Sequence, residues 1–196
     1  VGTAANAMGN IIINNDEAVP AADLATFNAA FFGSVTTLKN QTGVVTLGGL
    51  NSVANNLGAA GLELRNVNLN NTLAVGNMWS KEANIAAGKT ITFTGVVASS
   101  GGLTLKNGAV ASFNGPNVKL SSVIIAAVAN QGVARFDDTA TITTAIGAQG
   151  AGLQLIDFVG TKASQVASVG ADLFATNINV GAQTIQATKD IKLGGT

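Results

Sequence analysis

The sequence predicts an all-β fold, and three observations support this prediction. Val, Ile, Leu and Thr recur in short runs broken by Asn and by 24 glycines in 196 residues, which is typical of short strands joined by tight turns. Several runs alternate strictly, as in Thr90-Ile91-Thr92-Phe93, so that every apolar side chain lies on one face. The runs also follow one another too closely for the helical crossovers of a βαβ fold.

The expected strands are distributed over the whole chain and are short. The intervening residues 51–58 and 76–87 are expected to be loops, and residues 162–169 either a second helix or a polar loop. The strands are expected at residues 10–13, 35–38, 44–47, 62–69, 90–97, 103–105, 110–113, 118–120, 122–128, 133–136, 140–143, 153–158, 177–180, 184–187 and 190–193.

Residues 20–33 are expected to form one short helix. Leu24, Phe27 and Phe31 fall at positions i, i+3 and i+7, and Gly33 supplies a C-terminal stop. We expect this helix to cap an open end of the β region, because it would cover apolar surface and a strand edge that could otherwise recruit another chain.

The chain is expected to be a single domain, since 196 residues with 47% hydrophobic content suffice for one sizeable core. Residues 1–17 are interpreted as an extended N-terminal segment and residues 34–196 as a repetitive region of short strands. Two architectures fit this region, a parallel β-helix or β-solenoid and an antiparallel β-sandwich. Asn-rich turns favour the solenoid, because Asn tolerates left-handed backbone conformations and stacked Asn side chains can bond along the axis.

The composition excludes several kinds of chemistry. The chain has no His, Cys or Tyr, so Ser-His-Asp triads, Cys-His dyads and the usual zinc sites are impossible. Charged residues make up only 10%, and ten Lys and Arg balance ten Asp and Glu, which argues against nucleic acid and anionic membrane surfaces. The longest apolar run, residues 123–129, suits a buried strand and is too short to span a membrane. We expect no catalytic residue, no cofactor or metal, and no membrane insertion by this chain.

Carboxylates are the remaining chemical candidates, because glycoside hydrolysis requires only two placed acids. Asp137 and Asp138 are the tight acidic pair beyond the N-terminal segment. As neighbours in an extended strand they would point to opposite faces. The favoured interpretation is a solvated turn after Phe136, with a calcium site as the alternative.

One polar stretch is a candidate contact site. Asn77, Met78 and Trp79 lie where the strand rhythm is interrupted, and Trp79 is the single Trp of the chain. Trp79 is interpreted either as a core plug under a loop or as an exposed contact residue. We retain all three residues as possible contacts.

The N-terminal segment suggests self-assembly. Ile11, Ile12 and Ile13 form a strongly β-prone run after small, flexible residues. Because alternation would expose Ile12 opposite its neighbours, the strand is expected to need burial on both faces. It could therefore pair in trans with an identical subunit.

Two phrases of the sequence carry a family resemblance. They are residues 132–147, GVARFDDTATITTAIG, and residues 177–182, NINVGA. Together with the Cys-free composition rich in Gly, Asn, Thr and Ala, they resemble the passenger regions of autotransporter adhesins, particularly rickettsial outer-membrane and surface-cell-antigen proteins, over residues 43–196. The resemblance implies a right-handed β-helix that projects from a bacterial cell, is linked to a membrane-embedded barrel and contacts host receptors. The chain lacks barrel strands with aromatic girdles, so any translocator would lie outside these residues.

The sequence thus predicts a non-catalytic, exported surface protein, an adhesin-type β-helical scaffold located at the cell surface or outside the cell. Its expected partner is a protein or glycan on a host or neighbouring cell. The alternative is a self-assembling filament or surface-layer subunit, whose partners are identical subunits joined by the N-terminal strand. A third hypothesis is a polysaccharide-active enzyme built on a solenoid.

Overall fold

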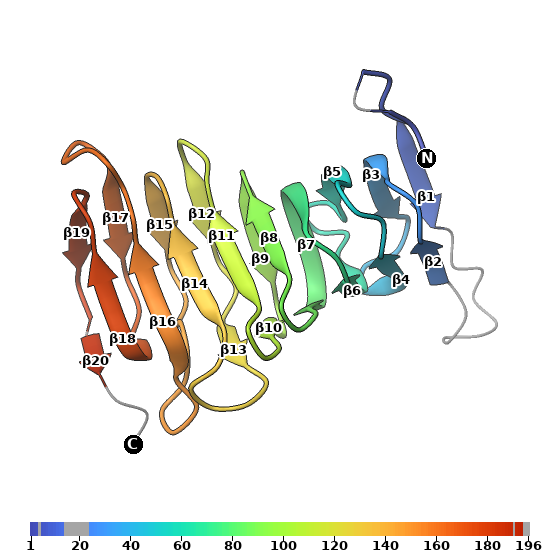
Figure 1. Cartoon of the computed structure of the whole chain (residues 1–196). Helices are drawn as coiled ribbons and strands as arrows, with labels where there is room; N and C mark the ends of the chain where they lie inside the picture. Colours follow the sequence, from blue (N-terminus) through green and yellow to red (C-terminus); the bar gives the residue numbers. More distant parts are fainter. Residues whose placement is uncertain (4, 14–23, 190, 194–196) are drawn as a thin grey trace.

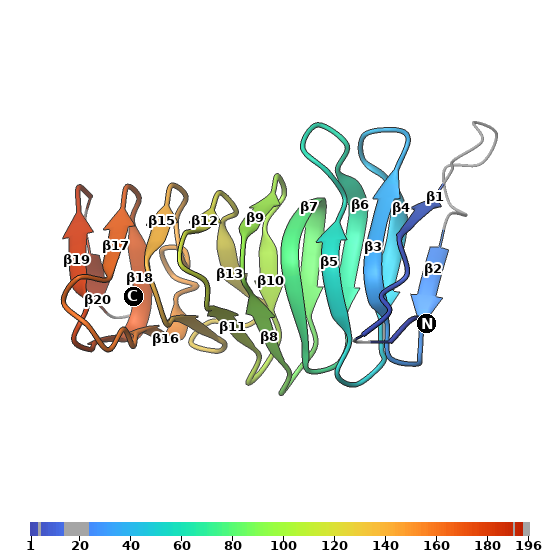
Figure 2. The same ribbon diagram turned by 90° about the horizontal axis from the view of Figure 1, so that it is seen from above.

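The computed structural model describes residues 1–3, 5–13, 24–189 and 191–193. These residues form an all-β parallel solenoid of about 8 turns and contain no helix. Figures 1 and 2 show the turns, or coils, stacked along one axis, with the first strands at one end and the last strands at the other. The predicted solenoid is confirmed. The antiparallel sandwich is wrong, because all pairings between the named strands of the described chain are parallel.

The described part of the solenoid is built from short strands. Most have three to six residues, and only β7 and β18 are longer. Their bounds are β1 Asn10–Ile13, β2 Leu24–Phe27, β3 Phe32–Thr37, β4 Thr42–Leu47, β5 Val53–Leu57, β6 Leu64–Leu69, β7 Leu73–Ile85, β8 Thr90–Phe93, β9 Val96–Ser99, β10 Leu103–Leu105, β11 Val110–Phe113, β12 Val118–Leu120, β13 Ile124–Ala126, β14 Val133–Phe136, β15 Ala140–Ile142, β16 Leu153–Phe158, β17 Val166–Val169, β18 Leu173–Val180, β19 Thr184–Ala187 and β20 Ile191–Leu193.

The cross-section of the solenoid changes along its axis. In the first coils, β1, β3, β5 and the first half of β7 form one sheet, and β2, β4, β6 and the second half of β7 form another. The first sheet then divides into two. Both β8 and β9 pair with β7, and the chain bends between them at Thr94 and Gly95. Later coils are three-sided, with the columns β8-β11-β14-β16-β18, β9-β12-β15-β17-β19 and β7-β10-β13.

A column of phenylalanines runs through the core of the three-sided half. Phe93, Phe113, Phe136 and Phe158 share one register across β8, β11, β14 and β16 and are buried. Their ring centroids lie 5.5, 4.8 and 5.2 Å apart, and adjacent rings are nearly parallel. Stacking at these distances adds ring attraction to the burial of apolar area. Successive coils are therefore joined by side chains as well as by backbone hydrogen bonds.

Buried serines line one corner of successive coils. Ser80, Ser99 and Ser122 are at most 2% exposed. The Ser80 hydroxyl donates to Ser99 Oγ (3.1 Å), and Ser99 Oγ lies within hydrogen-bond distance of the carbonyl oxygens of Lys81 (3.1 Å) and Gly102 (2.9 Å). The Ser99 N–H in turn donates to Ser122 Oγ. These bonds satisfy polar groups that the corner removes from water.

Many of the predicted strand bounds are confirmed, including one in the N-terminal segment. The part of that segment beyond residue 13 lies outside the described residues. Strands with the predicted bounds are those at residues 10–13, 103–105, 110–113, 118–120, 133–136, 153–158 and 184–187.

The predicted helix at residues 20–33 is wrong where the structure describes it, and residues 20–23 lie outside the described part. Leu24–Phe27 is β2, and Phe32 opens β3. Phe27 and Phe31 do pack together, with centroids 4.5 Å apart, but across a strand end rather than along a helix. β2 pairs with β4 and β3 with β5, so tertiary pairing overrides the local helical spacing.

Three segments expected to be loops or a helix contain strands. Residues 51–58 include β5, residues 76–87 include most of β7, and residues 162–169 include β17. Conversely, the run at residues 123–129 contributes only the three residues of β13, and Val128 beside it is 58% exposed. A coil needs few inward side chains, so a polar segment can form a strand and an apolar one can lie on the surface.

Candidate functional site

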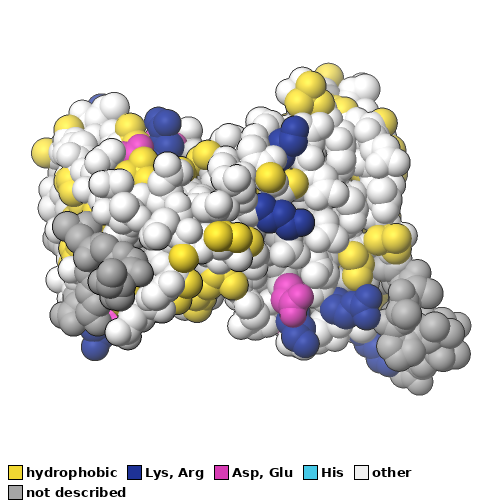
Figure 3. Space-filling view, turned by 60° about the horizontal axis from the view of Figure 1, so that its bottom comes forward, with side chains coloured by type: hydrophobic (Ala, Val, Ile, Leu, Met, Phe, Trp, Pro, Cys, Tyr) yellow, Lys and Arg dark blue, Asp and Glu magenta, His cyan; other side chains and the backbone are white. Residues whose placement is uncertain are grey.

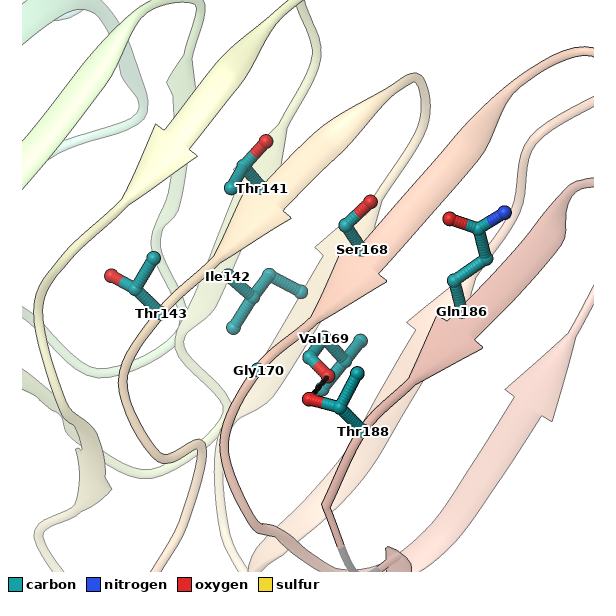
Figure 4. A pocket seen from close by; sticks show the side chains of 8 residues that line it. All are labelled: Thr141, Ile142, Thr143, Ser168, Val169, Gly170, Gln186 and Thr188. Carbon is teal, nitrogen blue, oxygen red and sulfur yellow. Dashed lines mark hydrogen bonds between the residues drawn. The ribbon is translucent and has the colours of Figure 1, made fainter.

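The outer face of the β12-β15-β17-β19 column carries a line of polar side chains. Alternation along β15 buries Ile142 and turns Thr141 outward. Thr141 is in register with Lys119 of β12 and Ser168 of β17, and Ser168 is in register with Gln186 of β19. We call these four residues, Lys119, Thr141, Ser168 and Gln186, the polar row. Figure 4 shows Thr141, Ser168 and Gln186 on successive strands, with their side chains directed to the same side of the sheet.

A hollow of about 280 Å³ lies beside the polar row. Gly170 has no side chain to fill the space between Thr143 and Thr188, which flank it in the neighbouring coils. Ile142 and Val169 also line the hollow, but they are each 1% exposed and turn their side chains to the core, so they line it with backbone. The result is a depression whose floor is backbone around Gly170 and whose margin carries polar side chains (Figure 4).

The polar row has hydrogen-bonding capacity that the described chain does not use. The side chains of Thr141, Ser168 and Gln186 make no hydrogen bond to any described residue, whereas the hydroxyls of Thr143 and Thr188 donate to backbone carbonyl oxygens at 3.2 and 3.4 Å. An exposed polar group in this condition bonds to water or to a ligand. The row is therefore the candidate binding surface.

A second hollow, of about 330 Å³, lies on the outer face of β4, β6 and β7. Asn66 Nδ2 donates to Glu82 Oε2 at 3.4 Å, and Asn84 Nδ2 lies 3.3 Å from Asn66 Oδ1 and 3.4 Å from Asn68 Oδ1. Stacked Asn side chains thus bond along the axis, on strands rather than on turns. Because these amides already bond to one another, this hollow has less free bonding capacity than the polar row.

The structure places the three predicted contact residues differently. Met78 is fully buried between β5 and β9, so it offers no surface to a partner in this fold. The Asn77 side chain donates to Asn56 Oδ1 (2.9 Å) and accepts from the Val96 N–H (2.8 Å). The second bond fixes the start of β9, where the solenoid becomes three-sided. Trp79 lies within β7 rather than in a loop and is partly exposed. Trp79 keeps its place as a contact candidate.

β1 places the three predicted trans-pairing residues at the first coil. β1 pairs in parallel with β3 of the same chain, and no described strand pairs with its other edge. Ile13 is buried and Ile11 is partly buried, whereas Ile12 is 53% exposed. The outward face of this strand is therefore not covered by the described chain, and pairing in trans stays a prediction.

The acidic pair lies at the corner after β14. Asp137 Oδ2 accepts from Ser112 Oγ and Asp137 Oδ1 from Arg135 Nε, each at 2.7 Å, while Asp138 Oδ1 accepts from Gln165 Nε2 at 3.1 Å. Both residues lie in the irregular segment after β14, as predicted, but they are partly buried and bond to other side chains, so the pair is not a fully solvated turn. Within the described ranges, no group of three His, Cys, Asp or Glu is placed to hold a metal.

Charged side chains are sparse on the face of the molecule that points downward in Figure 1 and comes forward in Figure 3. Figure 3 shows a few scattered charges there and apolar side chains gathered near the middle. Exposed apolar residues beside β13 are Val123 and Val128, at 38% and 58%. The described part of the chain has no helix that is long and apolar enough to cross a membrane.

The sequence analysis did not identify the polar row as a site. The alternation from Thr139 to Thr143 signals that Thr141 faces outward, but Ser168 and Gln186 come from segments of different sequence. Only the pairing of β15, β17 and β19 brings the three into line.

Comparison of the chain with family models, with curated proteins and with solved structures finds no match.

Proposed function

We propose that this chain is a non-catalytic, exported surface protein whose solenoid presents side chains and loops for adhesion, in the manner of an autotransporter passenger. The main support is the polar row, which displays unused hydrogen-bonding groups over successive coils of a scaffold whose coils are held together by parallel strand pairing. Such a scaffold binds through surface area and repeated contacts rather than through a reacting group. The resemblance of residues 132–147 and 177–182 to adhesin passengers supports export and surface location.

Corner loops enlarge the surface available to a partner. Two of them form tight arches closed by the antiparallel bridges Ala59–Leu62 and Ala148–Ala151. The loop after β13 carries the exposed Val128. Loops held on a rigid scaffold are common locations for binding residues, so these three loops and Trp79 are the other contact candidates.

Binding to cells tests the adhesive function directly. Fluorescently labelled chain should bind cultured animal cells saturably, and excess unlabelled chain should compete for this binding. Antibodies against the chain should also label intact cells of the producing organism without permeabilisation. A labelled chain that shows no saturable binding would contradict adhesion, labelling only after permeabilisation would contradict surface location, and turnover of any glycan in a panel would contradict a non-catalytic role.

The free edge of β1 favours one alternative function, self-assembly through this strand. Ile12 is 53% exposed on an edge strand, and exposed edges of this kind recruit other strands. Sedimentation velocity over a concentration series should then show mass rising with concentration, and Ile12→Lys should suppress the rise. A constant monomer mass at all concentrations would exclude this alternative.

A further inference from the structure

Polar groups recur along the β12-β15-β17-β19 column at the spacing of the coils. Lys119, Thr141, Ser168 and Gln186 occupy one register on successive strands, and neighbouring strands lie about 4.8 Å apart. One pyranose unit lengthens an extended polysaccharide by a similar distance. A polysaccharide laid parallel to the solenoid axis would therefore bring one sugar unit to each coil.

The side chains of the polar row match the hydroxyl groups of a sugar. The hydroxyls of Thr141 and Ser168 both donate and accept, and the Gln186 amide carries two donors and an acceptor oxygen. A sugar hydroxyl is likewise donor and acceptor. Because these side chains have no hydrogen bond within the described chain, binding a sugar displaces water and breaks no internal bond.

The depression at Gly170 supplies shape and a surface for ring contact. The hollow of about 280 Å³ beside the row includes Gly170, and so does an adjoining hollow of about 380 Å³ that Asp172 and Lys189 line. The C–H face of a pyranose ring can rest on the backbone at Gly170, between Thr143 and Thr188, while its hydroxyls reach the row.

The charge of the row favours an uncharged ligand. Lys119 is the only charged member of the row, and it stands at one end of it. An acidic polysaccharide carries a carboxylate or sulfate on many of its units and would call for a cation at several coils. The other three members are neutral, and Asp172 and Lys189 at the adjoining hollow have opposite charges, so the surface suits a neutral chain of sugar hydroxyls.

We infer that the outer face of β12, β15, β17 and β19 is a binding groove for an extended neutral polysaccharide that lies parallel to the solenoid axis. The inference rests on the proposed adhesive function, to which it adds a ligand class. It assigns hydrogen bonding to Thr141, Ser168 and Gln186 and ring packing to the hollow at Gly170.

Titration calorimetry with neutral oligosaccharides tests the groove. Cello-, chito- and malto-oligosaccharides of one to six units serve as probes, with oligogalacturonates as acidic counterparts. Affinity for at least one neutral series should rise with length up to about four units, since the row crosses four strands, and then level off. No neutral binding at millimolar concentration, an affinity independent of length, or tighter binding of the acidic series would each overturn the inference.

Gly170→Val tests the position of the groove. A Cβ at this residue would have its nearest neighbour at 3.5 Å, the Ile142 carbonyl oxygen, and the backbone is outside the left-handed region. The variant should therefore fold normally and fill the hollow, with at least a tenfold loss of oligosaccharide affinity. Gly9→Val is the matched control, because a Cβ there meets nothing within 4 Å, and it should bind like the parent chain.

Thr141→Val tests the hydrogen bonds, because it removes a hydroxyl and keeps the size and β-branching of the side chain. Affinity should fall between about two- and tenfold, the usual range for one lost hydrogen bond. Thr104→Val, on the outer face of β10, is the control and should not change affinity. Wild-type affinity in both Gly170→Val and Thr141→Val would place any sugar elsewhere and overturn the inference.

Cell binding by the same proteins separates this inference from the adhesive function. Cell binding without any oligosaccharide binding would overturn the groove and leave adhesion standing. Length-dependent oligosaccharide binding without cell binding would support the groove and contradict adhesion. Loss of both in Gly170→Val, with both retained in Gly9→Val, would support the two together.

Discussion

Replacing Phe136 by alanine should destabilise the solenoid by about 4 kcal/mol. The side chain is fully buried and stacks on both sides, with ring centroids 4.8 Å from Phe113 and 5.2 Å from Phe158. Truncation of a buried Phe typically costs about 3 to 5 kcal/mol, because apolar burial is lost and a cavity remains. Phe136 belongs in the upper half of this range, since the cavity would separate two other rings.

Two comparison variants isolate the contribution of stacking. Phe93 is equally buried but has one partner in the column, Phe113 at 5.5 Å. Phe93→Ala should therefore lower the free energy of unfolding by about 0.5 to 1.5 kcal/mol less than Phe136→Ala, which is the contribution of one stacked ring pair. Phe136→Leu keeps an apolar side chain in place and should cost only about 1.5 kcal/mol.

Urea unfolding followed by circular dichroism and by Trp79 fluorescence measures these differences. Trp79 lies in β7 at the change of cross-section, so its signal reports on coils away from Phe136. Coincident transitions give a free energy for the whole stack, while separated transitions assign the loss to the three-sided half. A cost below about 1 kcal/mol for Phe136→Ala, or equal costs for the three variants, would refute the reasoning.

Three further substitutions test corners and surface charge. In urea unfolding, Gly147→Ala should lower the free energy of unfolding by at least about 1 kcal/mol more than Gly150→Ala. Both glycines have positive φ, but only at Gly147 would a Cβ lie 2.1 Å from a backbone oxygen. Equal costs for the two variants would contradict this reasoning. Ser99→Ala should cost about 1 to 3 kcal/mol by the same assay, since it leaves buried partners unpaired, and a neutral result would mean that they bond elsewhere. Arg135→Ala should lower the free energy of unfolding by less than about 1 kcal/mol, because the Arg135 side chain in the 2.7 Å pair with Asp137 is 45% exposed. This cost should shrink in high salt. A larger cost that does not depend on salt would show that Arg135 contributes through packing.

Strict alternation made part of the fold predictable from the sequence. Where each inward position is apolar, as in β10 and β12, strand bounds could be predicted to the residue. β7 escaped prediction because the chain turns a corner inside it. Ser80 is buried, Lys81 and Glu82 are both exposed, and Ala83 is buried again, so the alternation changes phase in mid-strand. β5 escaped for a simpler reason, since its outward residues are largely Asn and it reads as a loop.

The candidate site depends on register, which the sequence alone does not reveal. Thr141 and Ser168 are 27 residues apart, and Ser168 and Gln186 only 18, so no constant period aligns them. The lengths of the intervening corners decide which residues become neighbours. The hollow at Gly170 depends in the same way on Thr143 and Thr188 flanking it.

The arch closed by the Ala148–Ala151 bridge shows how this architecture can accommodate new sequence. It adds residues to one coil between Ile146 and Leu153, yet both remain in register with β18. A Cβ on Gly150 at its tip would meet nothing within 4 Å, and the entropic cost of a longer loop grows only with the logarithm of its length. A foreign peptide grafted at this tip would be displayed to antibodies or receptors while the stacked interior beneath it stays unchanged.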